Sequence, residues 1–480
     1  MQHFSSQAAP VVETLSGKVR GHVTDGVGIW LGVPYGAATG ELGPFAEVET
    51  APAWEGTLDC GGLPAVFTQP QSRLAEVMGP AIDAYPQSDQ AFTVNVFAPQ
   101  DAQGLPVLVF VHGGGFSSGG GTRWYNGSAL ARNGNMVVVT VNYRLGIWGN
   151  LSAPDAPSNN AVRDVLAALR WIAANIKAFG GDADNVTLSG QSAGAVLTRL
   201  LTLCTEAKGL FKRAIMLSCP GRLGATADDI GDATHHVMKI LGVHNIAALA
   251  RESSARVLDA VMTATRERAV PGSVTPLFRP YTDGVLLRDW MDDLDTAAGR
   301  AHCSEIMVGF TREEFTSFLW QQAEAINDAP DSVLDWYRHA YGADAVVRYR
   351  QMASHRTGAT PYTQWVDGLS EQIFGLPAVT LASTYAEHGQ AFAYRFDLQT
   401  RKPHLYAPHC LELPFFFDNL TDWFDAPMLE GFSNDELQPL ASRFSAGVAS
   451  FVRTGNPGLD GWRAFSGTGP FLMSFDKDPV

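Results

Sequence analysis

Three runs of apolar residues in the first half of the chain predict buried strands. Residues 105–111 and 136–141 are dominated by valine and other apolar residues, and residues 186–189 form a shorter run of the same kind. Because consecutive positions are apolar, each run suits a strand covered on both faces of a sheet.

A helical period separates the second and third of these runs. Within residues 161–176, Val165, Leu169 and Ile172 recur at the spacing of one helix face. The succession of strand, helix and strand predicts an α/β fold with a doubly wound, mostly parallel sheet.

The sequence pattern changes between about 225 and 390, where segments with a helical period and many charged residues dominate, such as 331–341 and 377–388. The second segment opens on proline, which suits the first turn of a helix. We predict one domain over residues 1–480, with a helical cap inserted at about 225–390. The tail, residues 443–453, is a further amphipathic helix that should end at the Gly-Asn-Pro of 455–457.

Composition narrows the possible partners. The chain has 480 residues, 34 basic and 49 acidic, with a formal net charge of −15, which argues against a nucleic-acid partner.

No apolar run approaches the ~20 residues that a membrane span needs, and the opening residues lack the pattern of a signal peptide. Five scattered cysteines indicate free thiols and a reducing compartment. We therefore expect a cytoplasmic protein, monomeric or weakly dimeric.

A Gly-x-Ser-x-Gly motif, residues 190–194, follows the third predicted strand and precedes a helix-like stretch, residues 195–203. This is the context of a nucleophile elbow, in which Ser192 sits on a tight, strained turn with its hydroxyl exposed. Side chains at Gly190 and Gly194 would clash in such a turn.

A second glycine motif, His112-Gly-Gly-Gly-Phe116, directly follows the first predicted strand. Consecutive glycines allow backbone N–H groups to face a reacting carbonyl, as an oxyanion hole requires. Together, the two motifs indicate nucleophilic catalysis by serine.

Further motifs make the chain resemble the type-B carboxylesterases, which have the α/β-hydrolase fold and include cholinesterases and bacterial p-nitrobenzyl esterases. The resemblance runs nearly end to end. The matching stretches are residues 30–35, 95–99, 141–146, 168–171, 179–182, 211–216 and 278–284, in addition to the two glycine motifs.

The resemblance implies the remaining site residues. The family's acid motif corresponds to Gly309-Phe-Thr-Arg-Glu-Glu314, which makes Glu314 the acid and Glu313 its nearest alternative. The histidine motif corresponds to His409-Cys-Leu-Glu-Leu-Pro-Phe415, which makes His409 the base and His404 its nearest decoy. The implied oxyanion donors are the N–H groups of three residues: Gly114, Gly115 and Ala193.

The chain departs from the family pattern near the site. Gln191 replaces the usual glutamate before the serine, Phe315 replaces a glycine after the acid, and Cys410 replaces a glycine after the histidine. Cys60 has no obvious partner, so we expect the segment 61–87 to lack the disulfide of secreted members and to act as a mobile lid. This segment contains no tryptophan, which argues against a specialist for choline esters.

The resemblance implies a serine carboxylic-ester hydrolase that works through an acyl-enzyme, on short-chain or aryl esters. It needs no metal and no organic cofactor, and its partner is a small-molecule ester. The alternatives are an amide or carbamate hydrolase with the same triad, or a non-catalytic binding member of the family. The candidate pocket residues are all aromatic: Phe116, Trp124, Phe315, Phe318, Trp320 and Phe416.

Overall fold

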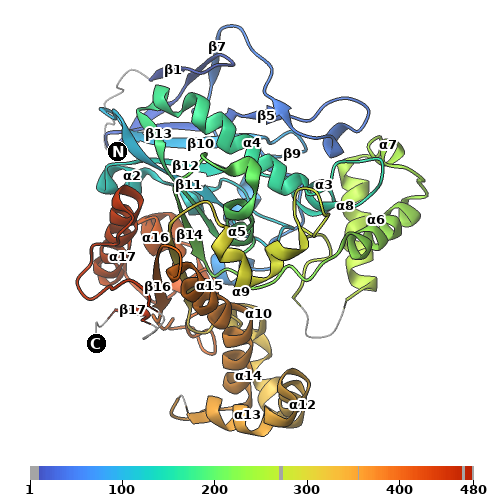
Figure 1. The fold of residues 1–480 in the computed structure, drawn as a ribbon, viewed down its shortest axis with the longest axis vertical. Coiled ribbons are helices and arrows are strands. Elements are labelled where there is room, and N and C mark those ends of the chain that lie inside the picture. Colours follow the sequence, from blue (N-terminus) through green and yellow to red (C-terminus); the bar gives the residue numbers. More distant parts are fainter. Residues whose placement is uncertain (1–9, 270–273, 355, 467–470, 478–480) are drawn as a thin grey trace.

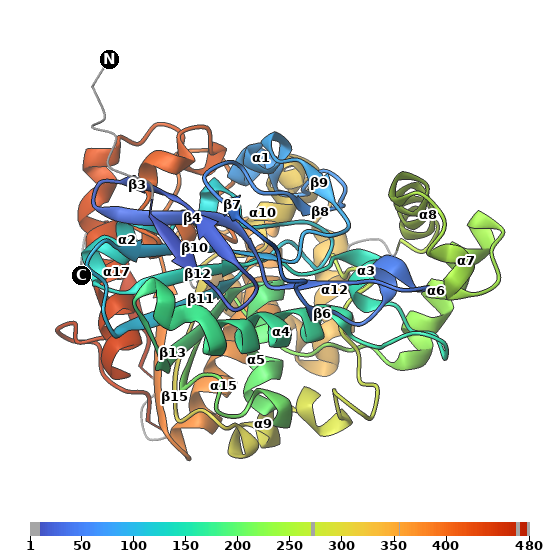
Figure 2. The same cartoon turned by 90° about the horizontal axis from the view of Figure 1, so that it is seen from above.

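A ten-stranded sheet with helices on both faces forms the body of the protein (Figures 1 and 2). The structure is a computed structural model that describes residues 10–269, 274–354, 356–466 and 471–477. Across the sheet the strands are β17 (Met473–Phe475), β16 (Gln390–Phe396), β15 (Glu305–Thr311), β14 (Arg213–Leu217), β13 (Gly181–Gln191), β11 (Leu105–Val111), β12 (Val137–Val141), β10 (Thr93–Pro99), β4 (Val27–Pro34) and β3 (His22–Thr24).

The sheet is parallel from β12 to β17 and antiparallel from β12 to β3. The three predicted strands are confirmed as β11, β12 and β13. Their carboxyl ends meet at one edge of the sheet, which is the usual place for a ligand site in an α/β fold.

Both faces of the sheet are covered, as the apolar runs predict. Along β11, Val107, Val109 and Val111 pack in one core cluster, whereas Leu108 and Phe110 pack in another on the opposite face. The first cluster contains helices α4 (Asn160–Asn175), α5 (Ala193–Leu203) and α15 (Leu376–Ala386), and the second contains α2 (Ser128–Gly134), α16 (Leu413–Phe416) and α17 (Asn434–Thr454).

The predicted helices are present with shifted ends. Residues 161–176 correspond to α4 and residues 195–203 to α5, and the tail helix α17 begins well before residue 443. It begins early because the side chain of Ser433 accepts a hydrogen bond from the N–H of Glu436 and so caps the first turn. It ends at Gly455, which has a left-handed φ of +81°.

The predicted helical cap is interrupted by the sheet. Strand β15 lies inside the range 225–390 and pairs with β14 and β16, so the helices form two insertions on either side of it. The first insertion holds α6 (Ala227–Leu241), α7 (Ile246–Leu249), α8 (Ser254–Glu267) and α9 (Leu294–Ala297). The second holds α10 (Thr316–Leu319), α11 (Ala323–Asn327), α12 (Pro330–Tyr341), α13 (Ala345–Ser354), α14 (Pro361–Ser370) and α15, and Figure 1 shows α12 to α14 projecting from the body.

The segment 61–87 lies folded against the body. It contains β8 (Val66–Phe67), which pairs with β9 (Gln87–Ser88), and the short helix α1 (Ala75–Met78). Gln69 ties the segment to Gly119, donating to its carbonyl at 2.8 Å and accepting from its N–H at 2.7 Å. Cys60 is buried and free. Opening of this segment as a lid stays a prediction.

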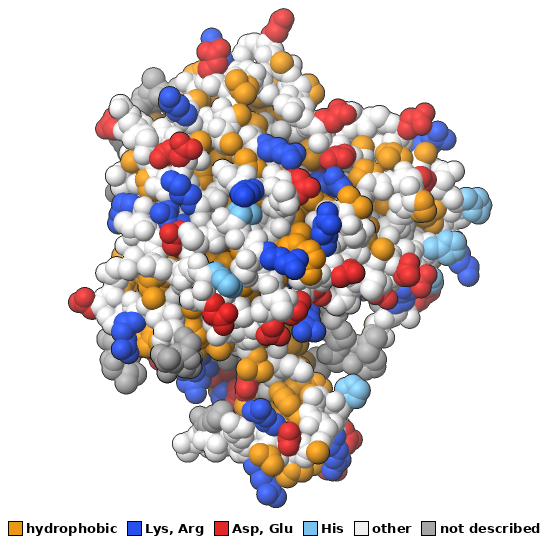
Figure 3. All heavy atoms as spheres, in the orientation of Figure 1, with side chains coloured by type: hydrophobic (Ala, Val, Ile, Leu, Met, Phe, Trp, Pro, Cys, Tyr) orange, Lys and Arg blue, Asp and Glu red, His pale blue; other side chains and the backbone are white. Residues whose placement is uncertain are grey.

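The surface carries side chains of both charges, and Lys and Arg gather near the middle of the face in Figure 3, beside exposed apolar groups. Within the ranges that the structure describes, we find no helix with the length and apolar character that a membrane crossing requires.

Candidate active site

Ser192 occupies a strained turn between β13 and α5. Its φ of +55° and ψ of −119° lie outside the regions that L-residues ordinarily adopt. The turn is held in place because the N–H of Ser192 donates to the carbonyl of Leu217 on the neighbouring strand at 2.9 Å. Strain of this kind persists only where the surroundings enforce it, and it is concentrated at functional sites.

The glycines beside Ser192 are required by close backbone contacts. A Cβ atom on Gly190 would lie 2.3 Å from the carbonyl oxygen of Gly194, and a Cβ atom on Gly194 would lie 2.0 Å from that of Val111. Both distances are far below van der Waals contact, so neither position tolerates a side chain. The elbow therefore forms for the reason expected from the sequence.

The glycine loop 113–115 packs directly against this elbow. A Cβ atom on Gly113 would lie 2.3 Å from the side-chain oxygen of Gln191, and Gly114 has a φ of +113° that favours glycine. The N–H groups of Gly114, Gly115 and Ala193 have no hydrogen-bond acceptor among the residues that the structure describes. They are thus available for an oxygen atom of a ligand.

His112, which precedes the loop, brings no charge to it. Its Nδ1 lies 2.8 Å from the carbonyl oxygen of Gly113, and its ring stacks on Tyr143. Burial lowers the pKa of His112 to about 4, so the imidazole is neutral near pH 7.

His409 and Glu314 are brought together from two different loops. Glu314 follows β15 and is fully buried, and one carboxylate oxygen accepts a hydrogen bond from the N–H of Thr311 at 2.8 Å. Its other oxygen contacts Nδ1 of His409. A carboxylate in this position fixes the ring and favours the tautomer with the proton on Nδ1.

The two alternative residues lie elsewhere. Glu313 points away from His409 and accepts hydrogen bonds from Arg356 at 2.8 Å and from the N–H of Ala407 at 3.1 Å. His404 pairs with Glu324 at 3.1 Å and is partly exposed. Neither of them lines the cavity that contains Ser192.

The free nitrogen of His409 faces Gln191. The side-chain nitrogen of Gln191 lies 3.1 Å from Nε2 of His409 and 3.2 Å from the sulfur of Cys410. Within the part of the chain that the structure describes, Ser192 and His409 form no hydrogen bond with each other, although both line one cavity. Contacts between nucleophile and base are often long in a free enzyme and tighten when substrate binds.

The electrostatic surroundings favour a positive charge on His409. Burial opposes that charge, but the sulfur of Cys410 and the carboxylate of Glu314 outweigh it, so the pKa of His409 lies well above its usual value. Burial raises the pKa of the Cys410 thiol, and the neighbouring His409 lowers it in part. Cys410 has a φ of +77°, in the left-handed region that favours glycine.

A second buried carboxyl group, Glu412, lies near the pair. It accepts a hydrogen bond from the hydroxyl of Ser218 at 3.0 Å, and its other oxygen has no partner among the described residues. Burial, with a contribution from Glu314, raises the pKa of Glu412 to about 7.

Glu412→Gln should flatten the pH dependence of stability. Because the pKa of Glu412 rises from 4.5 to about 7 on folding, the native state binds the proton more tightly than the unfolded chain. Its stabilising contribution is complete below about pH 4.5 and is lost as the pH rises through about 7. Thermal unfolding of the two proteins across this range measures the effect. Parallel curves would contradict it.

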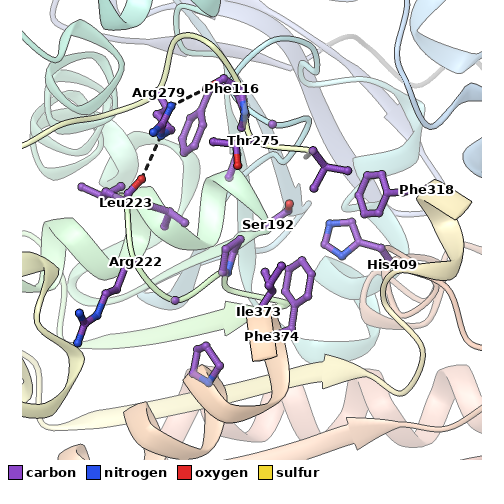
Figure 4. A pocket seen from close by; sticks show the side chains of 18 of the residues that line it. Phe116, Ser192, Arg222, Leu223, Thr275, Arg279, Phe318, Ile373, Phe374 and His409 are labelled. Atoms are coloured by element: carbon purple, nitrogen blue, oxygen red, sulfur yellow. Dashed lines mark hydrogen bonds between the residues drawn. The ribbon is translucent and has the colours of Figure 1, made fainter. Parts of the chain in front are cut away.

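Ser192 and His409 open into a cavity of about 680 Å³, a size typical of sites for small molecules. Figure 4 shows the rings of Phe318 and Phe374 on either side of His409, with centroid distances of 5.8 and 5.1 Å from the imidazole. The candidates Gly114, Gly115, Ala193, Phe116 and Phe318 line this cavity as well.

The other predicted pocket residues lie outside the cavity. Trp124 stacks on Trp423, and Phe416 packs against Phe110 in the core beneath the sheet. Phe315 is buried behind Phe318 and Phe374, and Trp320 lies under Lys402. These four side chains belong to the core or the surface. The prediction was wrong for them because aromatic character alone does not distinguish a pocket residue from a core residue.

Sequence reasoning missed most of the cavity wall. The wall includes residues from segment 61–87 and from both helical insertions, namely Arg73, Leu223, Arg279, Leu294, Ile373 and Phe374. No local pattern marks them, because each becomes a wall residue only when separate loops meet.

The sheet, the strained serine turn and the cavity together define the class of protein as an α/β-hydrolase. The model of the carboxylesterase family matches residues 8–480. The chain therefore belongs to the carboxylesterase family and is an ester hydrolase, as the resemblance of its motifs implied.

Individual relatives agree with this family. The para-nitrobenzyl esterase of Bacillus subtilis is 32% identical over 95% of this chain and 92% of its own length. The phenmedipham hydrolase of Pseudarthrobacter oxydans is 29% identical, over 97% of this chain and 94% of its own. A solved carboxylesterase of Geobacillus stearothermophilus superposes with a TM-score of 0.83 at 29% identity, covering 97% of this chain and 96% of its own.

Proposed function

We propose that Ser192 is the nucleophile of this carboxylesterase, His409 its general base and Glu314 the acid that orients the base. The observation that carries this proposal is the contact of Glu314 with Nδ1 of His409, whose ring lines the same cavity as Ser192. The carboxylate holds the ring in place, and in its neutral form the imidazole then keeps its lone pair on Nε2.

The reaction then proceeds in two displacements. Ser192 Oγ attacks the ester carbonyl while its proton moves to Nε2 of His409, and the tetrahedral intermediate collapses to expel the alcohol, which takes that proton. Water, activated by the same nitrogen, then hydrolyses the acyl-enzyme and releases the acid. Glu314 stabilises the imidazolium in both steps.

The N–H groups of Gly114, Gly115 and Ala193 would hold the oxyanion. Their lack of partners among the described residues supports this role, because it leaves the three N–H groups free to donate to a substrate oxygen in the cavity that they line. Donors fixed in the backbone need no reorganisation when the charge develops on the substrate oxygen.

The shape of the cavity supports short-chain or aryl esters as substrates. Phe116, Phe318 and Phe374 give it an aromatic wall next to the reacting groups. Amides and carbamates are the alternative, because the same residues would serve them and only the leaving group differs.

A series of p-nitrophenyl esters from acetate to palmitate tests this proposal. We expect kcat/KM to peak among the short acyl chains and to fall for the long ones, because the aromatic side chains beside the reacting groups suit a compact acyl group. A maximum at palmitate would contradict the substrate class. Absence of turnover for every ester, under conditions where the protein is folded, would contradict the function.

We also propose that the protein works in a reducing compartment, the cytoplasm. The support is chemical: all five cysteines are free and buried, and burial raises the pKa of the Cys60, Cys204 and Cys303 thiols to about 12. Thiols of this kind act as small apolar side chains.

A further inference from the structure

The charged side chains that line the cavity are mostly basic. They are three arginines and one aspartate, namely Arg73, Arg222, Arg279 and Asp295. The charged groups that line the cavity thus have an excess of positive charge, whereas the whole chain has a net charge of −15. None of the three arginines has a carboxylate within ion-pair distance among the residues that the structure describes.

Two of these arginines are not directed at the reacting centre. Arg279 donates to the carbonyl oxygens of Leu223, Pro276 and Gly224 at 2.9 to 3.0 Å, so its guanidinium is occupied in holding the first insertion together. Arg222 points away from Ser192 (Figure 4).

Arg73 lies beside the glycine loop. A Cβ atom on Gly115 would lie 2.9 Å from a terminal nitrogen of Arg73, so the guanidinium and the proposed oxyanion donor are neighbours. The other terminal nitrogen donates to the carbonyl of Val274 at 3.2 Å. Among the residues that the structure describes, most of the five donors of the group thus have no partner at the wall of the cavity.

The residues beside Arg73 hold the segment in this folded position. The N–H of Leu74 donates to the hydroxyl of Ser72 at 3.2 Å, and the side chain of Leu74 is buried in the core. Arg73 belongs to segment 61–87, and in the folded position of that segment its guanidinium lies next to the reacting centre, where it can select between substrates.

We propose that Arg73 pairs with a carboxylate on the substrate, so that the cavity favours esters that carry an anionic group near the scissile carbonyl. This proposal rests on the proposed function, since Ser192 and the glycine loop define where that carbonyl lies. Arginine suits the role because its planar fork pairs with both oxygens of a carboxylate.

The negative net charge of the protein does not oppose this preference. Charges farther away than the Debye length, about 8 Å at physiological salt, are largely screened. A substrate carboxylate in the cavity therefore responds to Arg73 much more than to the distant acidic surface.

Two matched pairs of esters test the proposal. The mono-4-nitrophenyl ester of adipic acid and 4-nitrophenyl hexanoate share a six-carbon acyl chain, and only the first carries a carboxylate. In the second pair, 4-acetoxybenzoate carries the charge on its leaving group, and 4-methylphenyl acetate is its neutral counterpart. We expect Arg73→Gln to lower the ratio of kcat/KM for the anionic over the neutral ester by about tenfold in at least one pair.

The controls separate charge from fold and from catalysis. Arg170→Gln removes an exposed arginine of α4 and should leave both ratios as in the wild type, whereas Arg73→Lys should give an intermediate ratio. Unchanged ratios in Arg73→Gln, or an equal fall for both members of each pair, would overturn the proposal. Failure of the wild type to hydrolyse the neutral esters would instead overturn the proposed function.

Discussion

Ser192→Ala should abolish ester hydrolysis while leaving the fold intact. The variant loses the atom that attacks the carbonyl, and the loss of such a nucleophile lowers kcat by about 10⁴-fold or more. The fold should survive because alanine fits wherever serine does, and the hydrogen bond from residue 192 to Leu217 is made by the backbone. Turnover of p-nitrophenyl acetate and the thermal unfolding temperature measure the two effects.

Alanine should also tolerate the strained conformation no worse than serine does. The φ of +55° at position 192 costs a similar amount for any residue with a Cβ atom. The unfolding temperature of Ser192→Ala should thus lie close to that of the wild type. Retained activity in a folded variant would show that another residue attacks the ester.

His409→Ala should lose activity nearly as completely, by about 10⁴-fold or more, because Ser192 then has no base. His404→Ala is the matched control: it removes a histidine five positions away that pairs with Glu324 outside the cavity. We expect this control to stay within about twofold of the wild type, since exposed ion pairs contribute little. Both variants should be assayed with the same p-nitrophenyl ester.

The reverse result, an inactive His404→Ala beside an active His409→Ala, would show that the wrong loop residue had been assigned as the base. Equal and partial losses in both variants would point to a general disturbance of residues 404–409. The distinction is sharp because His409 contacts the buried carboxylate of Glu314, whereas His404 pairs with the exposed Glu324.

The sequence allowed prediction of those features that depend on short stretches of chain. The elbow at Ser192 and the loop at Gly114 follow from glycines that meet backbone atoms a few residues or one strand away. The strands β11, β12 and β13 follow from apolar runs. The choice of Glu314 over Glu313 depended on the family's motif, and the contact with His409 separates the two on physical grounds.

Features that depend on contacts between distant segments could not be predicted. Phe116 lines the cavity and Trp124 does not, although both are aromatic and only eight positions apart. The strand β15 was not predicted because its seven residues lie inside the region that was interpreted as a helical cap. Arg73 carries no local signal at all, and its position beside Gly115 appears only in the folded chain.

The division of the helical region by β15 has a consequence for how this enzyme could acquire new substrates. Ser192 and Glu314 each follow a strand of the sheet, whereas much of the cavity wall comes from the insertions before and after β15. Insertions or exchanges within these helices can therefore reshape the wall while the strands keep the reacting groups in place. In a laboratory evolution experiment, diversity confined to residues 220–300 and 316–386 should yield altered selectivity with few inactive clones, while the same diversity in the ends of β13 and β15 should yield mostly inactive ones.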